Sequence, residues 1–343
     1  MTPTTPVPPP RRRRLGLAAL ALALTVVLAG CGGDGDDGEA TAAATEGDPS
    51  NVTLRWAVQA DGVRSLLKAS GQLDDVPYKI EFAEFQFGPP IVEALGAGKV
   101  DIGWVGSTPP IFGAAAQTNF RVIGSIHRRN KTGAGILVKK DSGITDVSQL
   151  KGKNVAIPKG SNAHGLLLTA LHRVGLKPTD VKPVYLPPAD GLTAFDRGRV
   201  DALAIWEPYI AVATAKGATV LAGGPPDEDG YGFELASSAA LDDPDKAAAV
   251  KDAVKRLQIA IAWGNDNPEE FAKAWSEESK LPLDVTRPAV PEILQDLIPV
   301  DDAAIASQQK LADRLFEDDV IPKRVDFASI VDRDILTTAE PAQ

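Results

Sequence analysis

The stretch GKVDIGWVGSTPPIFGAAA, residues 98–116, is the most informative one for the fold. A glycine and a short turn lead into Asp101 and an apolar run that predicts a buried strand. Ser107-Thr108 and two prolines follow, and these are typical of a helix start, because Ser and Thr favour the N-cap and Pro the first helical positions. A similar stretch, GRVDALA, recurs at residues 198–204. The repetition predicts two similar α/β lobes and argues against a short-period solenoid.

Short apolar runs alternate with helical patterns through the body of the chain. We expect strands at 52–58, 78–85, 101–105, 121–126, 135–139, 154–157, 181–185, 202–205, 219–221 and 233–237. We expect helical segments at 63–69, 90–97, 109–116, 147–151, 161–174, 191–197 and 208–215, and in the tail at 244–264, 268–279, 285–297 and 301–318. This alternation predicts an α/β fold with mostly parallel sheets and helices on both faces.

The two series of strands and helices predict two lobes. We expect residues 51–138 and 235–343 to form the first lobe, with the C-terminal helices, and residues 139–234 to form the second. The chain would then cross between the lobes near Val138–Lys140 and Phe233–Leu235. Two lobes joined by two crossing strands imply a hinge and a cleft that binds a ligand.

The first fifty residues differ in composition from the body. Arg11–Arg14 form a positive run, the fifteen residues 15–29 carry no charge, and Leu28-Ala29-Gly30-Cys31 looks like a lipobox. Such a positive segment, short apolar segment and small-residue site are typical of a secretory signal peptide, and the apolar part falls short of the roughly 20 residues that span a bilayer. We therefore expect residues 1–30 to be a lipoprotein signal peptide and Cys31 to carry a lipid anchor.

Two questions stay open for this segment. A plain signal peptide with an incidental Cys would also explain the composition, and Arg13-Arg14 leave general and twin-arginine export as alternatives. Residues 31–50 are rich in Gly, Asp, Ala, Thr and Glu and lack large apolar side chains. They predict a flexible, self-repelling tether between anchor and body.

Charge and cysteine content exclude several classes of protein. The 343 residues include 36 Lys and Arg against 46 Asp and Glu, a formal net charge of −10. Removal of residues 1–30 takes away four Arg and no acid, which leaves 32 basic against 46 acidic residues and a charge of −14. Such a chain argues against nucleic-acid binding. One Cys and three His argue against a disulfide scaffold and a dedicated zinc or copper site, so we expect no metal and no cofactor.

Two helix starts that follow strands are candidates for binding an anion. One contains Ser107 and Thr108, and the other contains Ser161, Asn162 and His164. Both would lie at the carboxyl ends of strands, where open α/β sheets bind ligands. Because a helix N-terminus offers free N–H groups and partial positive charge, two of them facing one cleft would hold a small oxyanion. The alternative is that both are ordinary N-caps.

Four residues near the expected cleft, His164 among them, each allow two interpretations. Trp206 would wall the pocket and contact an apolar ligand tail, or pack as an aromatic at a strand end. Arg128, in the positive cluster 127–129, would reach the ligand or lie in a solvated loop. Asp190 would belong to a cleft loop or to a loop-to-helix junction. His164 would donate a hydrogen bond to the ligand or stabilise its own capping turn.

At these residues the chain resembles the periplasmic aliphatic-sulfonate-binding proteins of ABC importers, whose relatives include taurine, nitrate and thiamine-precursor binders. The matching stretches are GPPIVEAL (88–95), KVDIGWVGSTPPIFGAAA (99–116), KGSNAHGLL (159–167), YLPPADGLTAF (185–195), VDALAIWEPY (200–209) and VIPKRVDF (320–327). The resemblance implies a type II periplasmic-binding-protein fold with a sulfonate in the interlobe cleft. It also implies ligand contacts from Gln59, Ser107-Thr108, Ser161-Asn162 and Trp206-Glu207.

Two departures from the family pattern leave the exact ligand open. Ser107 stands where many sulfonate binders are expected to carry Asp, and His127–Asn130 stands where relatives often carry Pro-rich sequence. We expect a monomeric solute-binding lipoprotein, held outside the cytoplasm by its lipid, that delivers an organosulfonate to the permease and ATPase of an importer.

The alternatives are a taurine, nitrate or thiamine-precursor pyrimidine binder, a sensor, and a desulfinase-like enzyme of the same fold. A desulfinase of that type uses a cysteine nucleophile, and no Cys follows Cys31.

Overall fold

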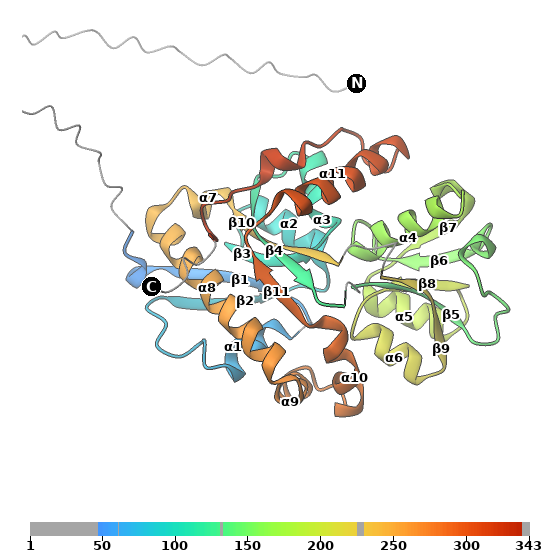
Figure 1. Cartoon of the computed structure of the whole chain (residues 1–343), viewed down its shortest axis with the longest axis horizontal. Coiled ribbons are helices and arrows are strands. Elements are labelled where there is room, and N and C mark those ends of the chain that lie inside the picture. The colour runs from blue at the N-terminus through green and yellow to red at the C-terminus, as the bar shows by residue number, and fades with distance from the viewer. Residues whose placement is uncertain (1–46, 61, 131–132, 225–229, 338–343) are drawn as a thin grey trace, which may run out of the picture. The chain divides into compact units, whose positions relative to one another are not determined.

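Two mixed β-sheets organise the residues that the computed structural model describes, which are 47–60, 62–130, 133–224 and 230–337 (Figure 1). The signal peptide, Cys31 and most of the tether that we predict lie outside these residues. The first sheet has the order β11-β4-β10-β3-β1-β2. Its strands are β1 (Thr53–Val58), β2 (Lys79–Glu84), β3 (Ile102–Gly106), β4 (Phe120–Arg128), β10 (Tyr231–Ser237) and β11 (Gln295–Ile298).

The second sheet has the order β7-β6-β8-β5-β9. Its strands are β5 (Gly135–Lys139), β6 (Asn154–Ile157), β7 (Lys182–Tyr185), β8 (Ala202–Ile205) and β9 (Ala218–Gly223). In each sheet one central strand is parallel to both neighbours: β1 lies between β2 and β3, and β6 lies between β7 and β8. The remaining pairs are antiparallel, so the prediction of mostly parallel sheets is wrong.

The chain passes between the sheets at other places than we predicted. The strand β5 pairs with β8 and β9 of the second sheet, so the first crossing lies between Arg128 and Gly135 and not near Val138–Lys140. The second lies between β9 and β10, before Tyr231, and not near Phe233–Leu235. Both errors have one cause: an apolar run such as 135–139 has the same pattern whichever sheet it joins.

Helices cover both faces of each sheet, as the alternating pattern predicts. Those that follow strands of the first sheet are α1 (Val63–Ala69), α2 (Gly88–Gly96) and α3 (Pro109–Ala115), and those of the second are α4 (Asn162–Arg173), α5 (Pro188–Asp196) and α6 (Tyr209–Ala215). The tail contributes α7 (Ser238–Leu241), α8 (Pro244–Asp266), α9 (Pro268–Ser279), α10 (Leu283–Ile293) and α11 (Asp302–Glu317). Short 3-10 turns are Pro49–Asn51, Val147–Leu150, Pro178–Asp180 and Phe327–Ile330.

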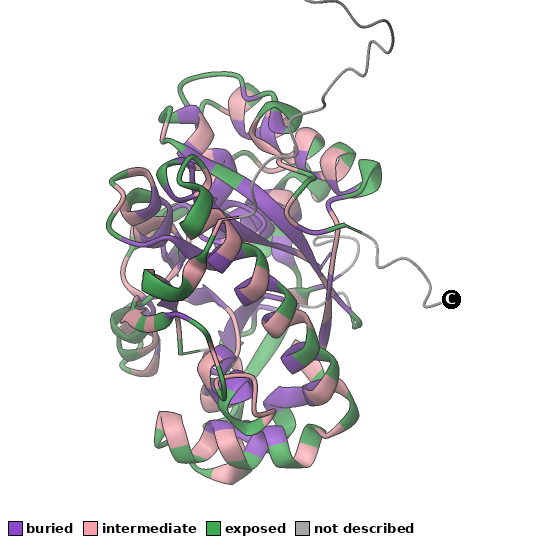
Figure 2. Ribbon diagram, turned by 90° about the vertical axis from the view of Figure 1, so that its left-hand side faces the viewer, coloured by how far each residue is buried: buried purple, intermediate pink, exposed green. Residues whose placement is uncertain are grey.

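The core follows from this layering, since buried residues concentrate in the strands and on one side of each helix (Figure 2). One cluster packs α1, α8 and α9 on the first sheet around Trp56 and Trp275, and another packs α2, α3 and α11 on its other face around Phe120 and Phe233. The second cluster also contains Leu168 of α4, a helix of the second sheet. Apolar packing therefore joins the two sheets.

The tail shows one element that the sequence pattern conceals. We predicted a helix at 285–297, but α10 ends at Ile293 and β11 pairs antiparallel with β4. The apolar residues 290, 293, 294 and 297 have helical spacing, which explains the prediction. Pro288 and Pro291 lie inside α10 and do not mark its end; the residues after Leu294 instead pair with β4 and bury Leu297.

The end of the predicted tether is also ordered. Asp48 caps the turn Pro49–Asn51, and its backbone N–H donates to Asp245 of α8 at 2.9 Å. The described chain therefore begins against α8, at Gly47. No described helix is long and apolar enough to cross a membrane.

The repeated Gly-x-Val-Asp stretches make the same contact in both sheets. Asp101 precedes β3, donates its N–H to the Arg55 carbonyl and accepts the Arg55 N–H on its carboxylate, both at 2.8 Å. Asp201 precedes β8 and forms the same reciprocal pair with Asn154, at 2.9 and 2.8 Å. Each aspartate thus fixes the register at which a strand begins beside its parallel neighbour.

The two aspartates differ in their surroundings. Asp101 is 1% exposed and also binds the Arg55 guanidinium at 2.6 Å and Lys246 at 3.1 Å. Burial alone would raise the pKa of Asp101, but hydrogen bonds from Arg55 and Lys246 outweigh it and lower that pKa below the ordinary value. Asp201 is only half-buried.

This contrast predicts unequal costs for the same substitution. Asp101→Asn should lower the free energy of unfolding by about 3 kcal/mol, because two cations lose a buried partner. Asp201→Asn is the matched control and should cost about 1 kcal/mol or less. Because the Asp101 pKa is depressed in the folded state, its contribution is present above the unfolded pKa of about 3.9 and is lost as pH falls through the folded value. Urea unfolding at pH 7 and pH 3.5 measures both effects; an equal loss at pH 7 in the two variants would contradict this account.

Candidate functional site

A polar pocket lies where strand ends of the two sheets meet. It has a volume of about 310 Å³, counting space open to solvent. Its walls are Gln59, Gly88, Trp104, Gly106, Pro109, Arg128, Ser161, Asn162 and Trp206. Gln59 and Gly106 follow or end strands of the first sheet, whereas Ser161 and Trp206 follow strands of the second. Five of the ten ligand-binding residues that the sequence predicts therefore line one pocket.

In the described part of the chain, three helices begin at this pocket, α2 at Gly88, α3 at Pro109 and α4 at Asn162, and the start of α4 holds the residues that the sequence predicts. Ser161 is the N-cap, its Oγ accepts from the His164 N–H, and the same hydroxyl donates to the Pro158 carbonyl at 2.7 Å. The N–H groups of Asn162 and Ala163 lie in the first turn, where the helix itself has no acceptor for them. Gly106 allows Asn162 to approach closely, since a Cβ on Gly106 would collide with the Asn162 side chain. The pocket is thus built against partial positive charge.

Arg128 supplies the full positive charge. Its side chain is only 6% exposed, and its guanidinium carbon lies 5.7 Å from the ring centre of Trp104. Gln59 donates to the Trp104 carbonyl at 3.1 Å, which fixes its amide beside the same ring. Arg128 is therefore a buried side chain of the pocket wall and does not lie in a solvated loop.

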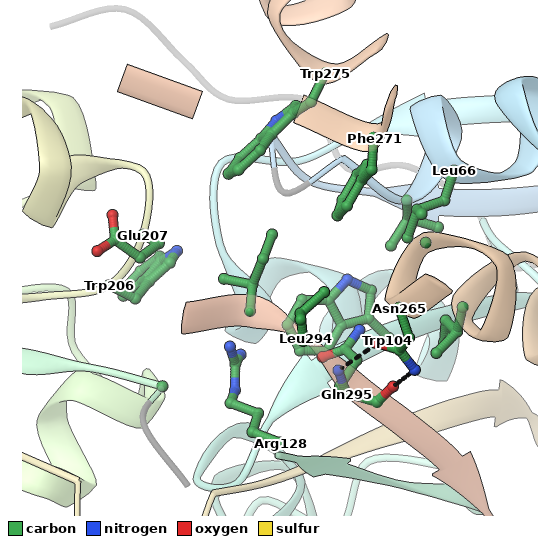
Figure 3. Close-up of a pocket in the computed structure, with 15 residues that line it drawn as sticks. Leu66, Trp104, Arg128, Trp206, Glu207, Asn265, Phe271, Trp275, Leu294 and Gln295 are labelled. Atoms are coloured by element: carbon green, nitrogen blue, oxygen red, sulfur yellow. Dashed lines mark hydrogen bonds between the residues drawn. The ribbon is translucent and has the colours of Figure 1, made fainter. Parts of the chain in front are cut away.

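An apolar pocket adjoins the polar one. It has a volume of about 550 Å³, counting open space, and shares Trp104, Arg128 and Trp206 with the polar pocket. Its other walls are Val63, Leu66, Gly133, Glu207, Ile261, Gly264, Asn265, Phe271, Trp275, Ile293, Leu294 and Gln295. Figure 3 shows Arg128 extending into this space between Trp206 on one side and Leu294 on the other. The two pockets together offer a cationic polar end and an apolar end.

Glu207 lies in the wall of the apolar pocket and not in the polar one. One carboxylate oxygen accepts the Ala211 N–H at 2.9 Å and so stabilises the first turn of α6. Burial raises the pKa of Glu207 to about 7; the nearby Glu292 also raises it, while the Ala211 N–H and Arg128 lower it. The carboxyl therefore changes its charge near neutral pH.

Four predicted residues do not line these two pockets. Asp190 is exposed in the first turn of α5, a loop-to-helix junction. His164 is buried between Phe112 and Tyr185, and its Nδ1 accepts the Gly160 N–H at 3.1 Å. Burial, and secondarily Lys159, lowers the pKa of His164 to about 4, so the ring is neutral and stabilises its own capping turn.

Ser107 and Thr108 are buried at the start of α3 but stand outside both pockets. The next two residues, Pro109 and Pro110, have no N–H, so α3 offers fewer free donors than the prediction of two anion-binding helix starts requires. Thr108 Oγ1 makes no hydrogen bond among the described residues and lies against Gly165 of α4. Thr108 thus contributes to the contact between the sheets.

Most residues of the apolar pocket carry no signal of a binding site in the sequence. Phe271 and Trp275 stand four residues apart on α9 and stack with ring centres 5.9 Å apart, in a segment that we predicted only as a helix. Trp104 lay in a predicted buried strand. A core residue and a pocket residue carry the same apolar signal, so no pattern in the sequence separates them. Among the described residues, no group of three or more His, Cys, Asp or Glu side chains is placed to hold a metal ion.

Comparison with known proteins identifies the family. Residues 85–270 match the sequence profile of the NMT1/THI5 like family. A protein of Escherichia coli (strain K12), named for aliphatic-sulfonate binding, is 36% identical over 291 residues, which cover 83% of this chain and 90% of that protein. The chain belongs to the family of aliphatic-sulfonate-binding proteins.

Two solved structures of this sulfonate-binding family have the same fold. The alkanesulfonate-binding protein SsuA from Xanthomonas axonopodis pv. citri, bound to MOPS, is 32% identical with a TM-score of 0.77, over 83% of this chain and 99% of that one. The periplasmic aliphatic sulphonate binding protein SsuA from Escherichia coli is 34% identical with a TM-score of 0.73, over 85% and 94% of the two chains. The prediction of a type II periplasmic-binding-protein fold is confirmed. These relatives are named as binding proteins, in agreement with the prediction of a binding protein and not an enzyme.

The contact between Thr108 and Gly165 generates a prediction about packing. A Cβ on Gly165 would collide with Thr108 Oγ1, so Gly165→Ala should lower the free energy of unfolding by about 1–3 kcal/mol. The double variant Gly165→Ala/Thr108→Ala removes the colliding hydroxyl and should recover most of the loss. Urea unfolding of the two variants and of Thr108→Ala completes a double-mutant cycle. Additive losses would mean that the two side chains do not meet.

Proposed function

We propose that this protein is the extracytoplasmic solute-binding component of an ABC importer and that it binds an aliphatic sulfonate between its two sheets. The observation that carries the proposal is the junction of the two pockets: Trp104, Arg128 and Trp206 belong to both. A polar end and an apolar end joined in this way match an anionic head on a hydrocarbon chain. The ligand is bound and released unchanged, and closure of the lobes around it provides the signal to the permease and its ATPase.

The sulfonate group occupies the polar pocket. N–H groups of the first turn of α4, the Gln59 amide and the Arg128 guanidinium supply donors to its oxygens. This arrangement suits a protein with an overall acidic composition, because a buried cation and a helix terminus act over a few ångströms, where the low local dielectric strengthens them. The distant acidic surface is screened by salt.

The hydrocarbon chain occupies the apolar pocket, against Leu294, Phe271 and Trp206. This half of the site favours an alkyl sulfonate over nitrate, which has no chain to bury. Contact with an alkyl chain also accounts for the gathering of aromatic side chains at one point of the molecule.

The anchor belongs to the same proposal. Cys31 carries a diacylglycerol that holds the monomeric body at the outer face of the cell membrane, and the acidic segment that follows allows the body to reach the permease. Mass spectrometry of protein from membranes and from a Cys31→Ser strain tests this; an unlipidated mature chain would point to a plain signal peptide.

A charge at the start of α4 tests the head position. Ser161→Asp keeps a good N-cap but places a carboxylate against the sulfonate, and should weaken hexanesulfonate binding roughly tenfold to a hundredfold. Ser161→Asn is the matched control, since Asn caps helices equally well without charge, and should change the dissociation constant by less than about threefold. Isothermal calorimetry measures both. Equal affinities of the two variants would remove α4 from the site.

Ligand length tests the tail position. Each methylene from methanesulfonate to hexanesulfonate should raise affinity by up to about fourfold, because burial of a CH₂ contributes about 0.8 kcal/mol. Leu294→Ala should reduce this increment, whereas Ile259→Ala, a substitution at an exposed position of α8, should leave it unchanged. Nitrate and sulfate, which have no chain, should bind more weakly than hexanesulfonate. A flat dependence on length would contradict the assignment of the apolar pocket, and another solute that bound where no sulfonate did would overturn the proposed function.

A further inference from the structure

Among the described residues in the wall of the apolar pocket, Glu207 is the one acidic side chain, and the binding of a plain alkyl sulfonate gives it no role toward the ligand. Figure 3 shows its carboxylate beside Trp206, on the side of the pocket opposite Phe271 and Leu66. A carboxyl group is costly in such a wall, since it loses hydration and the adjoining polar pocket is the one proposed to bind an anion. We infer that Glu207 is a specificity residue that selects sulfonates carrying a protonated amino group on their carbon chain, an inference that rests on the proposed function.

Position within the site supports this assignment. Glu207 lines the apolar pocket and is not among the residues that line the polar pocket, whereas the adjacent Trp206 lines both. A ligand whose sulfonate binds at α4 would therefore bring to Glu207 an atom of its chain and not its anionic head. If the ligand carries a charged group at that atom, the Glu207 carboxylate attracts the group only when it is a cation.

The groups around Glu207 allow its carboxyl to bind the ammonium group of such a ligand. It also lines a neighbouring pocket, together with Arg128, Ile210 and Glu292. Glu292 comes from α10, which packs on α6, and Arg128 comes from β4. Burial and Glu292 both favour the protonated carboxyl, and Arg128 opposes them, with a resulting pKa of about 7. A bound ammonium group would favour the ionised carboxylate instead, so its binding should release a proton near neutral pH.

The hydrogen bond to α6 provides the structural alternative. Glu207 could serve only as an acceptor for the Ala211 N–H. Glu207→Gln keeps an amide oxygen for this N–H and removes only the charge, so the variant separates the capping role from ligand selection.

Matched pairs of ligands test the inference by calorimetry. Butane-1-sulfonate and 3-aminopropane-1-sulfonate differ mainly by a terminal methyl in place of an ammonium, and propane-1-sulfonate and 2-aminoethane-1-sulfonate form a shorter pair. In at least one pair the native protein should bind the amino compound about tenfold more tightly. In Glu207→Gln this preference should reverse, because the amino compound loses its partner while the plain sulfonate no longer faces a carboxylate. A variant that merely folds poorly would bind both compounds more weakly.

Two further measurements sharpen the test. As pH falls from 8 to 6, the ratio of affinities for the amino compound and the plain sulfonate should decrease, because the free Glu207 carboxyl becomes protonated below its pKa of about 7. Titrations in two buffers of different protonation enthalpy should show proton release for the amino compound, absent in Glu207→Gln. Glu317→Gln, on the exposed end of α11, makes the same change of net charge and should preserve the preference.

Each outcome decides between the proposals. The inference would be overturned if the native protein preferred the plain sulfonate in both pairs. It would also be overturned if Glu207→Gln kept the native preference for the amino compound. Either result would leave sulfonate binding intact. Failure of all four compounds to bind would overturn the proposed function and, with it, the role of Glu207.

Discussion

The reciprocal pairing of an aspartate with the strand beside it is the constraint on which the site depends. Asp101 and Asp201 each donate a backbone N–H to the neighbouring strand and accept one in return on the carboxylate. Because a slip of one residue in a strand turns every side chain to the other face, this contact at the strand start determines what stands at the strand end. From Asp101 the register leads to Gly106, and from Asp201 it leads to Trp206. Both residues line the polar pocket.

Close approach of α4 to the end of β3 and the start of α3 completes this arrangement. Gly106 faces Asn162 and Gly165 faces Thr108, with no room for a side chain at either glycine. Leu168 then packs in the core of the first sheet, and Arg314 of α11 donates to Thr169 of α4 at 3.0 Å. The helix α4, whose N-terminus lines the polar pocket, is thus held by small residues, apolar packing and a hydrogen bond. Its position at the pocket is a property of the fold and needs few charged side chains.

The sequence predicts individual elements well because each has its own local pattern. The bounds of α1, α9, β5, β6 and β8 agree with the predicted ranges. Membership of a sheet has no local pattern: the run 135–139 is equally apolar in either sheet, and β11 carries helical spacing although it pairs with β4. Which sheet a strand joins depends on which sheet edge is available in the folded molecule, and a short stretch of sequence does not contain that information.

The same distinction separates the predicted half of the site from the missed half. Its polar half follows from rules that act within a few residues, such as the N-cap at Ser161 and the polar residues that follow a strand. Even there, the two prolines after Thr108 weaken the argument for a second helix terminus, a point visible in the sequence. The apolar half combines residues from α1, α8, α9 and α10, which are far apart in the chain. Most of these residues have the sequence pattern of core residues. They line a pocket only because the folded helices leave a space between one another.

Electrostatics explains why one buried arginine suffices in so acidic a molecule. The field of a surface carboxylate is reduced by water and by salt within about 8 Å at physiological ionic strength, whereas Arg128 and the start of α4 act where water is largely excluded. Added basic residues at the pocket mouth would speed encounter with an anion but would also retain sulfate and phosphate. A single buried cation leaves the distinction between anions to the chain that each one carries. In the proposed site this chain lies against the apolar pocket and Glu207, so the proposal places selectivity among anions in that wall more than in the anion site itself.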